Sequence, residues 1–172
     1  DNTPAPVRTI VRIGYTTDAL YLSFRALDPD PAAIRAHLRD RDSAFSDDWV
    51  GVFMDTFDDQ RRGYEFIVNP LGVQADLIND ATTGNEDPSW DGLWSSAGRI
   101  TAEGYEVEMR IPFSTLRFRN GGGDQRWGIS LFRNWPRDKR HQLASHKVPR
   151  ESNCFLCEWA KYEGLAGVQQ GR

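Results

Sequence analysis

The sequence lacks any continuous apolar run approaching the roughly 18 residues of a transmembrane helix, so it holds no candidate helical membrane span. It also lacks an excess of basic residues: the net charge is −4, which argues against nucleic acid as the main partner. The sequence shows no internal repeat and no low-complexity tract. No Ser/His/Asp arrangement is supported. The one glycine cluster lacks the strand-to-helix context that a phosphate-binding loop needs.

The residues that are present are ordinary for a soluble globular protein, with one exception. Hydrophobic residues make up 39% of the chain and charged residues 27%. A chain of 172 residues is expected to form a single domain over residues 1–172. The chain begins without Met and shows no signal peptide, so we expect a processed or excised segment. The exception is tryptophan, because six are many for this length.

The stretch from residue 46 to residue 76 organises the expected fold. Residues 49–54, 64–69 and 73–78 read as three consecutive strands with alternating side chains. Asn69-Pro70-Leu71-Gly72 predicts the second turn of this β-meander, because proline presets φ and glycine allows positive φ. One face of the first two strands is predicted to carry Val50, Val52, Met54, Tyr64, Phe66 and Val68. The other face is predicted to carry Trp49, Gly51, Phe53, Glu65, Ile67 and Asn69.

The rest of the chain also reads mainly as short strands between turns. Asp30 is expected to cap a short helix that starts at Pro31 and ends near Leu38. Further strands are expected at 7–14, 19–28, 93–100, 104–111, 127–135, 142–148 and within 154–168. We expect a surface loop at 79–89, one helical turn at 112–116 and a connector at 120–124. The sequence therefore predicts an all-β fold with little helix, an antiparallel β-sandwich or jelly roll.

Four segments carry a resemblance to a known family: DDWVGVFMD, YEFIVNPLGVQAD, SWDGLW and GYEVEMRIPFSTLRF. In this order and spacing, the chain resembles the family 9-like carbohydrate-binding module found at the N-terminus of bacterial outer-membrane β-barrel proteins. The resemblance covers residues 11–168. It implies a β-sandwich and a non-catalytic module of a larger cell-envelope protein, located in the periplasm, at the outer membrane or outside the cell. It also implies an oligo- or polysaccharide ligand and an association with polysaccharide catabolism.

Two departures from the family pattern keep a second function open. Family members usually open with a segment of the type DGxLDDxxW, and this chain starts downstream of it. Family 9 sugar binders commonly carry an acid in the strand that matches VGVFMD, where this chain has Gly51. The alternative function is a structural or interaction domain that docks on an outer-membrane barrel and binds no sugar.

Aromatic side chains are the first candidates for a sugar site, because pyranose C–H groups stack on ring faces. Polar partners for hydroxyl groups are expected on the meander. The alternative for each tryptophan is packing in the core, and solvent exposure of Trp90 and Trp94 discriminates the two functions. The predicted ligand-binding residues are Phe45, Trp49, Glu65, Asn69, Gln74, Trp90, Trp94 and Trp135.

The acidic loop DTFDD is the candidate metal site. Calcium takes six to eight oxygen ligands, often from clustered aspartates, and Asp55, Asp58 and Asp59 lie close together in the sequence. The resemblance supports this, since family 9 modules can hold structural calcium. The alternative is a solvated acidic loop. Haem binding, as in distantly similar sandwiches, would need Met54 or Met109 paired with His37.

The two cysteines, Cys154 and Cys157, are spaced as CFLC. Glu158 follows them where covalent haem attachment would need histidine. Zinc ligation together with His141 and His146, two free thiols and a disulfide all remain open. A disulfide requires a turn between the two residues, because positions i and i+3 of a flat strand face opposite ways.

A basic stretch runs from Arg133 to Arg150. It is a candidate surface for anionic polysaccharide, lipopolysaccharide or the acidic rim of an attached barrel, and its alternative is a solvated hairpin loop. The basic residues are Arg133, Arg137, Lys139, Arg140, Lys147 and Arg150.

Overall fold

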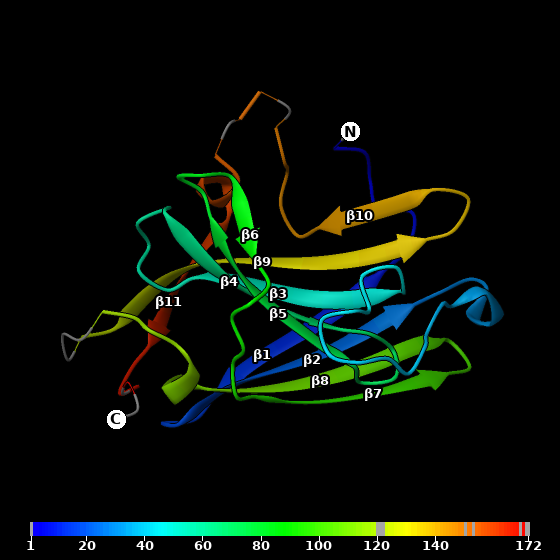
Figure 1. Cartoon of the computed structure of the whole chain (residues 1–172), viewed down its shortest axis with the longest axis horizontal. Helices are drawn as coiled ribbons and strands as arrows, with labels where there is room; N and C mark the ends of the chain where they lie inside the picture. The colour runs from blue at the N-terminus through cyan, green and yellow to red at the C-terminus, as the bar shows by residue number, and fades with distance from the viewer. Residues whose placement is uncertain (1, 120–122, 150, 153, 169, 171–172) are drawn as a thin grey trace.

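Two antiparallel β-sheets pack face to face in the computed structural model (Figure 1). The structure describes residues 2–119, 123–149, 151–152, 154–168 and 170. Helix in this described part is limited to three single 3-10 turns, Pro31–Ala33, Phe113–Thr115 and Leu156–Glu158. No helix among these residues has the length and apolar character needed to cross a membrane. The predicted β-sandwich class with little helix is confirmed.

The smaller sheet has four strands in the order β1-β2-β8-β7. Two hairpins build it, as the alternation in the sequence predicts. The first joins β1 to β2, and the second joins β7 to β8. Their bounds are β1 Thr9–Tyr15, β2 Ala19–Leu27, β7 Ser95–Thr101 and β8 Gly104–Pro112.

The larger sheet has seven strands, six of them in the order β10-β9-β3-β4-β5-β6. The seventh strand, β11, pairs with β9 on the same edge as β10, so the long strand β9 carries two short neighbours end to end. The bounds are β3 Trp49–Asp55, β4 Arg62–Val68, β5 Gln74–Asp80, β6 Asn85–Asp87, β9 Gln125–Pro136, β10 Arg140–Ala144 and β11 Ala160–Leu165.

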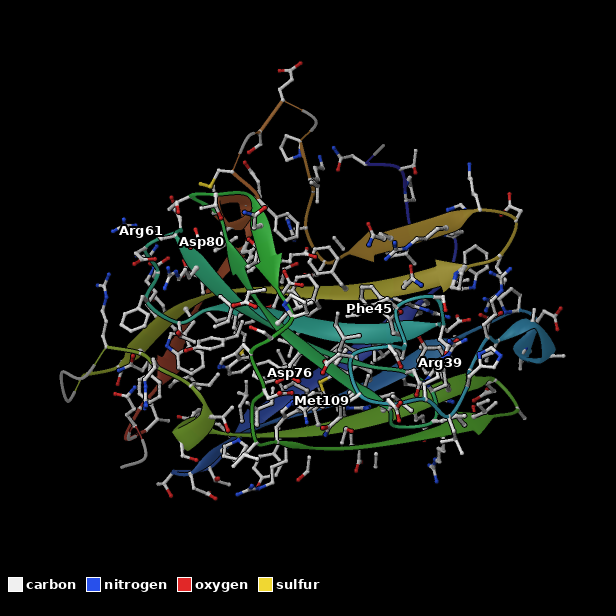
Figure 2. All side chains as sticks on the ribbon, viewed as in Figure 1. Arg39, Phe45, Arg61, Asp76, Asp80 and Met109 are labelled. Carbon is white, nitrogen blue, oxygen red and sulfur yellow. A yellow bond between two sulfur atoms is a disulfide. The ribbon has the colours of Figure 1, made fainter. Side chains whose placement is uncertain are left out.

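The main core lies between the two sheets, and strand alternation decides which side chains enter it. Every second residue of β2, β3, β4 and β8 faces inward, which confirms both predicted faces of the meander. Met109 of β8, labelled in Figure 2, is one of these inward residues. The inward set on the four strands is Leu20, Leu22, Phe24, Ala26, Val50, Val52, Met54, Phe66, Val68, Tyr105, Val107, Met109 and Ile111.

The second turn of the meander forms where the sequence predicts it. The Gly72 N–H donates to the Asn69 carbonyl over 3.0 Å, and Gly72 has φ of +85°. The Asn69 side-chain oxygen accepts hydrogen bonds from the N–H groups of Leu71 and Val73. Asn69 therefore builds the turn, and its side chain is fully engaged within the protein.

The predicted helix that ends near Leu38 is wrong, because only the 3-10 turn Pro31–Ala33 forms. Asp30 does cap that turn by accepting a hydrogen bond from the Ala32 N–H. Beyond it, the backbone N–H groups of Arg35 and His37 donate to the carboxylates of Asp48 and Asp47. These buried acids take the donors that a helix would have used, so the segment stays extended.

Two other predictions change in the structure. The expected loop at 79–89 contains the end of β5 and the whole of β6, which pairs back onto β5. The last hairpin strand starts two residues earlier than predicted, at Arg140. Residues 120–122 of the expected connector lie outside the described residues.

Arg133 and Arg137, which belong to the predicted basic stretch, do not lie in a solvated hairpin loop. Arg133 of β9 is 2% exposed and its guanidinium donates to the Asp28 carboxylate and the Leu27 carbonyl at the end of β2. Arg137 donates to both Asp28 and Asp48. These bonds join the two sheets through buried charges. Arg150 lies outside the described residues.

Candidate functional site

A pocket of about 370 Å³ lies on the outer face of the larger sheet, on the side away from the main core. Its base is formed by β3, β4 and β5, and its walls come from β9, β10, the β5–β6 hairpin and the segment around Phe155. Phe45, labelled in Figure 2, reaches it from the loop before β3. The sequence places aromatic and polar residues together in this pocket.

Five aromatic side chains line the pocket. Phe53 and Phe132 stack with their ring centroids 4.5 Å apart, and Phe155 packs 5.7 Å from Phe132. Trp49 is buried and its indole N–H donates to the Phe45 carbonyl. Phe45 and Phe155 keep part of their surface exposed, so they are the rings that a ligand can reach. Such walls offer apolar faces for the C–H side of a sugar ring.

Gly51 explains why the aromatic rings come so close together. It lies on the outer face between Trp49 and Phe53, and its neighbours across the sheet are Ile67 and Phe132. A Cβ atom at this position would lie 2.9 Å from a backbone carbonyl oxygen of β4 and 3.3 Å from the Phe53 ring. The site therefore has no room for the acid that family 9 sugar binders commonly carry on this strand.

The pocket takes its buried carboxyl group from the next strand instead. Glu65 of β4 lies directly between Phe53 and Leu77 on its two neighbouring strands and is 2% exposed. Its Oε1 atom is buried without a hydrogen-bond partner. Burial, with a smaller contribution from the charge of Glu86, raises the pKa of Glu65 to about 8, although a hydrogen bond from Asn79 opposes this. Near neutral pH Glu65 is mainly a protonated, neutral acid.

The rim of the pocket is polar and more exposed. Glu86 stands on β6 opposite Asn79. Arg140 and Gln142 come from β10, and the Arg140 Nε donates to the Asn134 side chain over 2.8 Å. Donors and acceptors therefore surround the aromatic walls, as they do in small-molecule pockets.

Three of the eight predicted ligand residues, Phe45, Trp49 and Glu65, line this pocket. Asn69 does not, since its side chain builds the turn. Gln74 lies on β5, where its side chain accepts from Arg41 and donates to the Trp94 carbonyl. Both polar side chains serve the scaffold.

The other three tryptophans that were predicted as ligand residues lie elsewhere. Trp94 is 8% exposed and packs edge-on against Phe66 in the main core, so it offers no ligand platform. Trp90 is half-buried against Tyr64 and Phe66. The Trp135 indole N–H donates to the Asp28 carboxylate over 2.8 Å. Trp94 and Trp127 pack in the core between the sheets, whereas Trp49 and Trp159 pack on the outer face of the larger sheet.

The DTFDD loop does not fit a calcium site. The buried carboxylate of Asp55 accepts backbone N–H bonds from Phe57, Asp59 and Gln60. Asp58 forms ion pairs with Arg126 and Lys161. Because protein donors already surround the two carboxylates, their oxygens organise the loop instead of pointing at a common ion.

Another acidic group, Asp42, Asp76 and Asp91, is close enough to hold a cation, and Asp76 is labelled in Figure 2. A guanidinium already stands there. Arg41 pairs with all three acids, and its Nε lies 2.9 Å from Asp76 Oδ1. Arg41 therefore supplies the positive charge that this cluster requires.

The haem alternative is wrong for the residues it needs. Met54 and Met109 are buried in the core between the sheets, whereas His37 lies 2.7 Å from the Asp47 carboxylate outside that core. Within the part of the chain that the structure describes, neither methionine therefore faces His37 across a pocket.

Cys154 and Cys157 form a disulfide across a single 3-10 turn, with Cα atoms 5.4 Å apart. The bond leaves neither thiol free for zinc. Phe155 lies inside the ring that it closes, and Leu156 and Trp159 anchor the turn against the outer face of the larger sheet. The turn thus holds Phe155 at the pocket wall.

Several pocket residues were not predicted from the sequence. Phe53 could have been found, because alternation puts it on the same face as Trp49. The others, Phe132, Phe155, Asn79, Glu86, Arg140 and Gln142, enter the pocket from strands and turns whose pairing no local pattern reveals.

A second hollow of about 510 Å³ lies at the ends of β4 and β5, near Arg61 and Asp80 in Figure 2. Its lining is mostly exposed side chains. Asp80 pairs with Arg62, whose Nε lies 3.0 Å away. This hollow has no buried polar group without a partner, so the aromatic pocket is the better candidate.

No family model and no curated protein matches the chain, but solved structures match its fold. A candidate carbohydrate-binding protein from Bacteroides uniformis ATCC 8492 is similar with a TM-score of 0.71 at 18% identity, over 93% of this chain and 79% of that one. A carbohydrate-binding module of family 9 from Caldicellulosiruptor kristjanssonii, solved with glucose, gives 0.59 at 12% identity, over 99% and 81%. The chain has the fold of a family 9 carbohydrate-binding module.

A second structure of the Caldicellulosiruptor kristjanssonii module, in complex with cellotriose, also has a TM-score of 0.59, at 13% identity over 93% of this chain and 76% of that chain. In this chain's family 9 fold, the aromatic pocket lies on the outer face of the larger sheet and the ionic network lies between the sheets.

Proposed function

We propose that the aromatic pocket binds a sugar residue of an oligo- or polysaccharide without cleaving it. The observation that carries the proposal is the combination of the partly exposed rings of Phe45 and Phe155 with the buried polar base at Glu65 and Asn79. Stacking on the rings would supply affinity, and hydrogen bonds to the base would fix the orientation of the sugar.

Two structures of the same fold support a saccharide ligand, because one holds glucose and the other cellotriose. Both belong to carbohydrate-binding modules, which favours binding over catalysis for this chain. The volume of about 370 Å³ lies within the usual range for small-molecule pockets.

The setting we propose is a larger cell-envelope protein that takes part in polysaccharide catabolism. The Cys154–Cys157 disulfide supports a compartment outside the cytoplasm, since disulfides persist in oxidising surroundings. The resemblance to modules at the N-terminus of outer-membrane proteins points the same way. A test is to fractionate cells that express the complete protein and to locate it with an antibody.

A structural or interaction domain that docks on an outer-membrane barrel is the second candidate. The burial of Trp94 in the core favours it, because an exposed tryptophan would have been expected in a sugar platform. The titration with sugars described in the next paragraph separates the two functions.

The test is isothermal titration calorimetry with glucose, cellotriose and longer β-linked oligosaccharides. We expect saturable binding that Phe155→Ala weakens by about tenfold, since truncation removes one stacking face. Phe57→Ala is the matched control, because Phe57 is a partly exposed phenylalanine that lines the larger hollow. Absence of binding to every sugar by a folded sample would favour the docking domain. Loss of binding in Phe57→Ala alone would move the site to the larger hollow.

A further inference from the structure

We propose that the aromatic pocket selects an amino sugar, a sugar that carries a free ammonium group, and that Glu65 is the residue that recognises the ammonium. This inference rests on the proposed saccharide function and names the class of saccharide. The relevant feature is that the deepest polar group of the pocket is an acid without a cation.

The arrangement of charges in the pocket favours a positively charged ligand group. Glu65 Oε1 is buried and has no partner, while Asn79 already hydrogen-bonds the same carboxyl group. Glu86 adds a second acid from β6. Arg140 is the one cation among the described lining residues, and it is exposed on β10 with its Nε bonded to Asn134. The base of the pocket is therefore acidic, and its positive charge lies at the rim.

A neutral sugar and an amino sugar would form different hydrogen bonds with Glu65. A hydroxyl group can exchange a hydrogen bond with the protonated acid and leaves no charge. An ammonium group would form a charge-assisted hydrogen bond with the ionised carboxylate, which is about twice as strong as a neutral one. The rings of Phe53 and Phe155 line the same pocket, and aromatic rings attract a cation placed over them. These two contacts predict a preference for the amino sugar.

Release of a proton on binding would distinguish recognition of the ammonium by Glu65 from stacking on the aromatic rings alone. Because burial raises the pKa of Glu65 to about 8, the free protein holds a proton there at pH 6. A bound ammonium stabilises the ionised form, so Glu65 must lose that proton to the buffer as the amino sugar binds. Glu86 and Arg140 are exposed at the rim, away from the buried base of the pocket.

The experiment uses three tetrasaccharides with the same β-linkage, built from glucosamine, N-acetylglucosamine or glucose. The three differ at one carbon of each sugar residue, which carries an ammonium, an acetamido or a hydroxyl group. Calorimetry at pH 6, repeated in two buffers of different ionisation enthalpy, gives both the affinity and the number of protons released. We expect the ion pair with the ammonium to exceed the cost of ionising Glu65 at pH 6, so that the glucosamine tetramer binds about tenfold more tightly than the other two and releases close to one proton per site.

Two variants assign the effect to Glu65. Glu65→Gln keeps the shape and cannot release a proton, so it should bind all three tetramers within about threefold of one another. Glu108→Gln removes one acid from the exposed face of the smaller sheet and should keep the full preference. Circular dichroism checks that each variant is folded. If Glu65→Gln fails to fold, the proton count of the unchanged protein decides alone.

The outcomes separate this inference from the proposed function. Equal or tighter binding of the glucose tetramer, or tight glucosamine binding without proton release, overturns the amino-sugar inference and leaves sugar binding standing. A preference that survives in Glu65→Gln overturns the role of Glu65. Failure of all three tetramers to bind overturns both proposals.

Discussion

At the scale of single residues, Gly51 and Glu65 decide the character of the pocket. Gly51 of β3 lets the aromatic rings lie close together, and Glu65 of the neighbouring strand β4 places a carboxyl group at the base of the pocket. Each of them breaks a local preference: glycine weakens a strand, and an acid is rarely buried without a partner. Exceptions of this kind are expected where a protein reserves a site for a ligand.

The buried acid predicts a pH-dependent stability. The pKa of Glu65 is about 8 in the folded chain against an ordinary value of 4.5, so the unfolded chain loses this proton first as pH rises. The free energy of unfolding therefore falls as the pH rises from 4.5 to about 8, by at most about 1.4 kcal/mol per pH unit. Glu65→Gln should gain stability relative to the unchanged protein across that window in urea unfolding. Parallel curves for the two proteins would contradict this.

A second prediction concerns Gly51. Gly51→Ala places a Cβ atom 2.9 Å from the Phe66 carbonyl oxygen, so we expect a loss of about 1–3 kcal/mol from overpacking. Gly14→Ala is the matched control on β1, where no atom lies within 4 Å of the added carbon. Urea unfolding measures both. A loss no greater in Gly51→Ala than in Gly14→Ala would show that the sheet yields at this point.

At the scale of elements, period-two alternation allowed most strands and their faces to be predicted. The meander, its turn at Asn69 and the inward face of β8 followed from local patterns alone. The segment after Pro31 did not, because Asp47 and Asp48 take its N–H groups from a distance in sequence. Strand β6 was missed since its three residues are all exposed and polar and show no alternation. Phe155 was missed because its turn is placed at the pocket only by the packing of Leu156 and Trp159 on the larger sheet, which no local pattern predicts.

The disulfide turn gives a prediction about binding. Cys154→Ser with Cys157→Ser opens a short ring, and loop-closure entropy assigns about 2 kcal/mol to such a ring. We expect sugar affinity to fall several-fold, because Phe155 then loses its fixed position at the wall. Calorimetry with and without a dithiol reductant measures this. The reductant should weaken the unchanged protein and leave the double variant unaffected, and an effect on both would place the cause elsewhere.

At the scale of the whole molecule, buried charged side chains connect the two sheets at one end of the sandwich. Asp28 at the end of β2 accepts bonds from Arg133, Trp135 and Arg137, all from β9 or the residue after it. The two sheets therefore meet through a buried ion network at one end and through apolar side chains elsewhere. The sequence showed a basic stretch here, but the acids that neutralise it lie about a hundred residues earlier in the chain.

This network predicts a large cost for one truncation. Arg133→Ala leaves the buried Asp28 carboxylate short of a charge partner, and breaking such a pair costs about 3–5 kcal/mol. Arg99→Ala on the exposed face of β7 is the control, since it removes a surface pair with Glu106 that is worth about 0–1 kcal/mol. Chemical unfolding followed by tryptophan fluorescence compares them. Equal losses would mean that the buried pair adds nothing beyond a surface pair.

The shared edge of β9 has a mechanical consequence. Strands β10 and β11 lie end to end on that edge, so β11 can be pulled away while β3 and β10 still hold β9. A load applied at the C-terminal end should therefore peel β11 from its neighbour one hydrogen bond at a time, at low force. The aromatic pocket draws no residue from β11. Under tension, this strand would yield first, and the pocket would keep its shape.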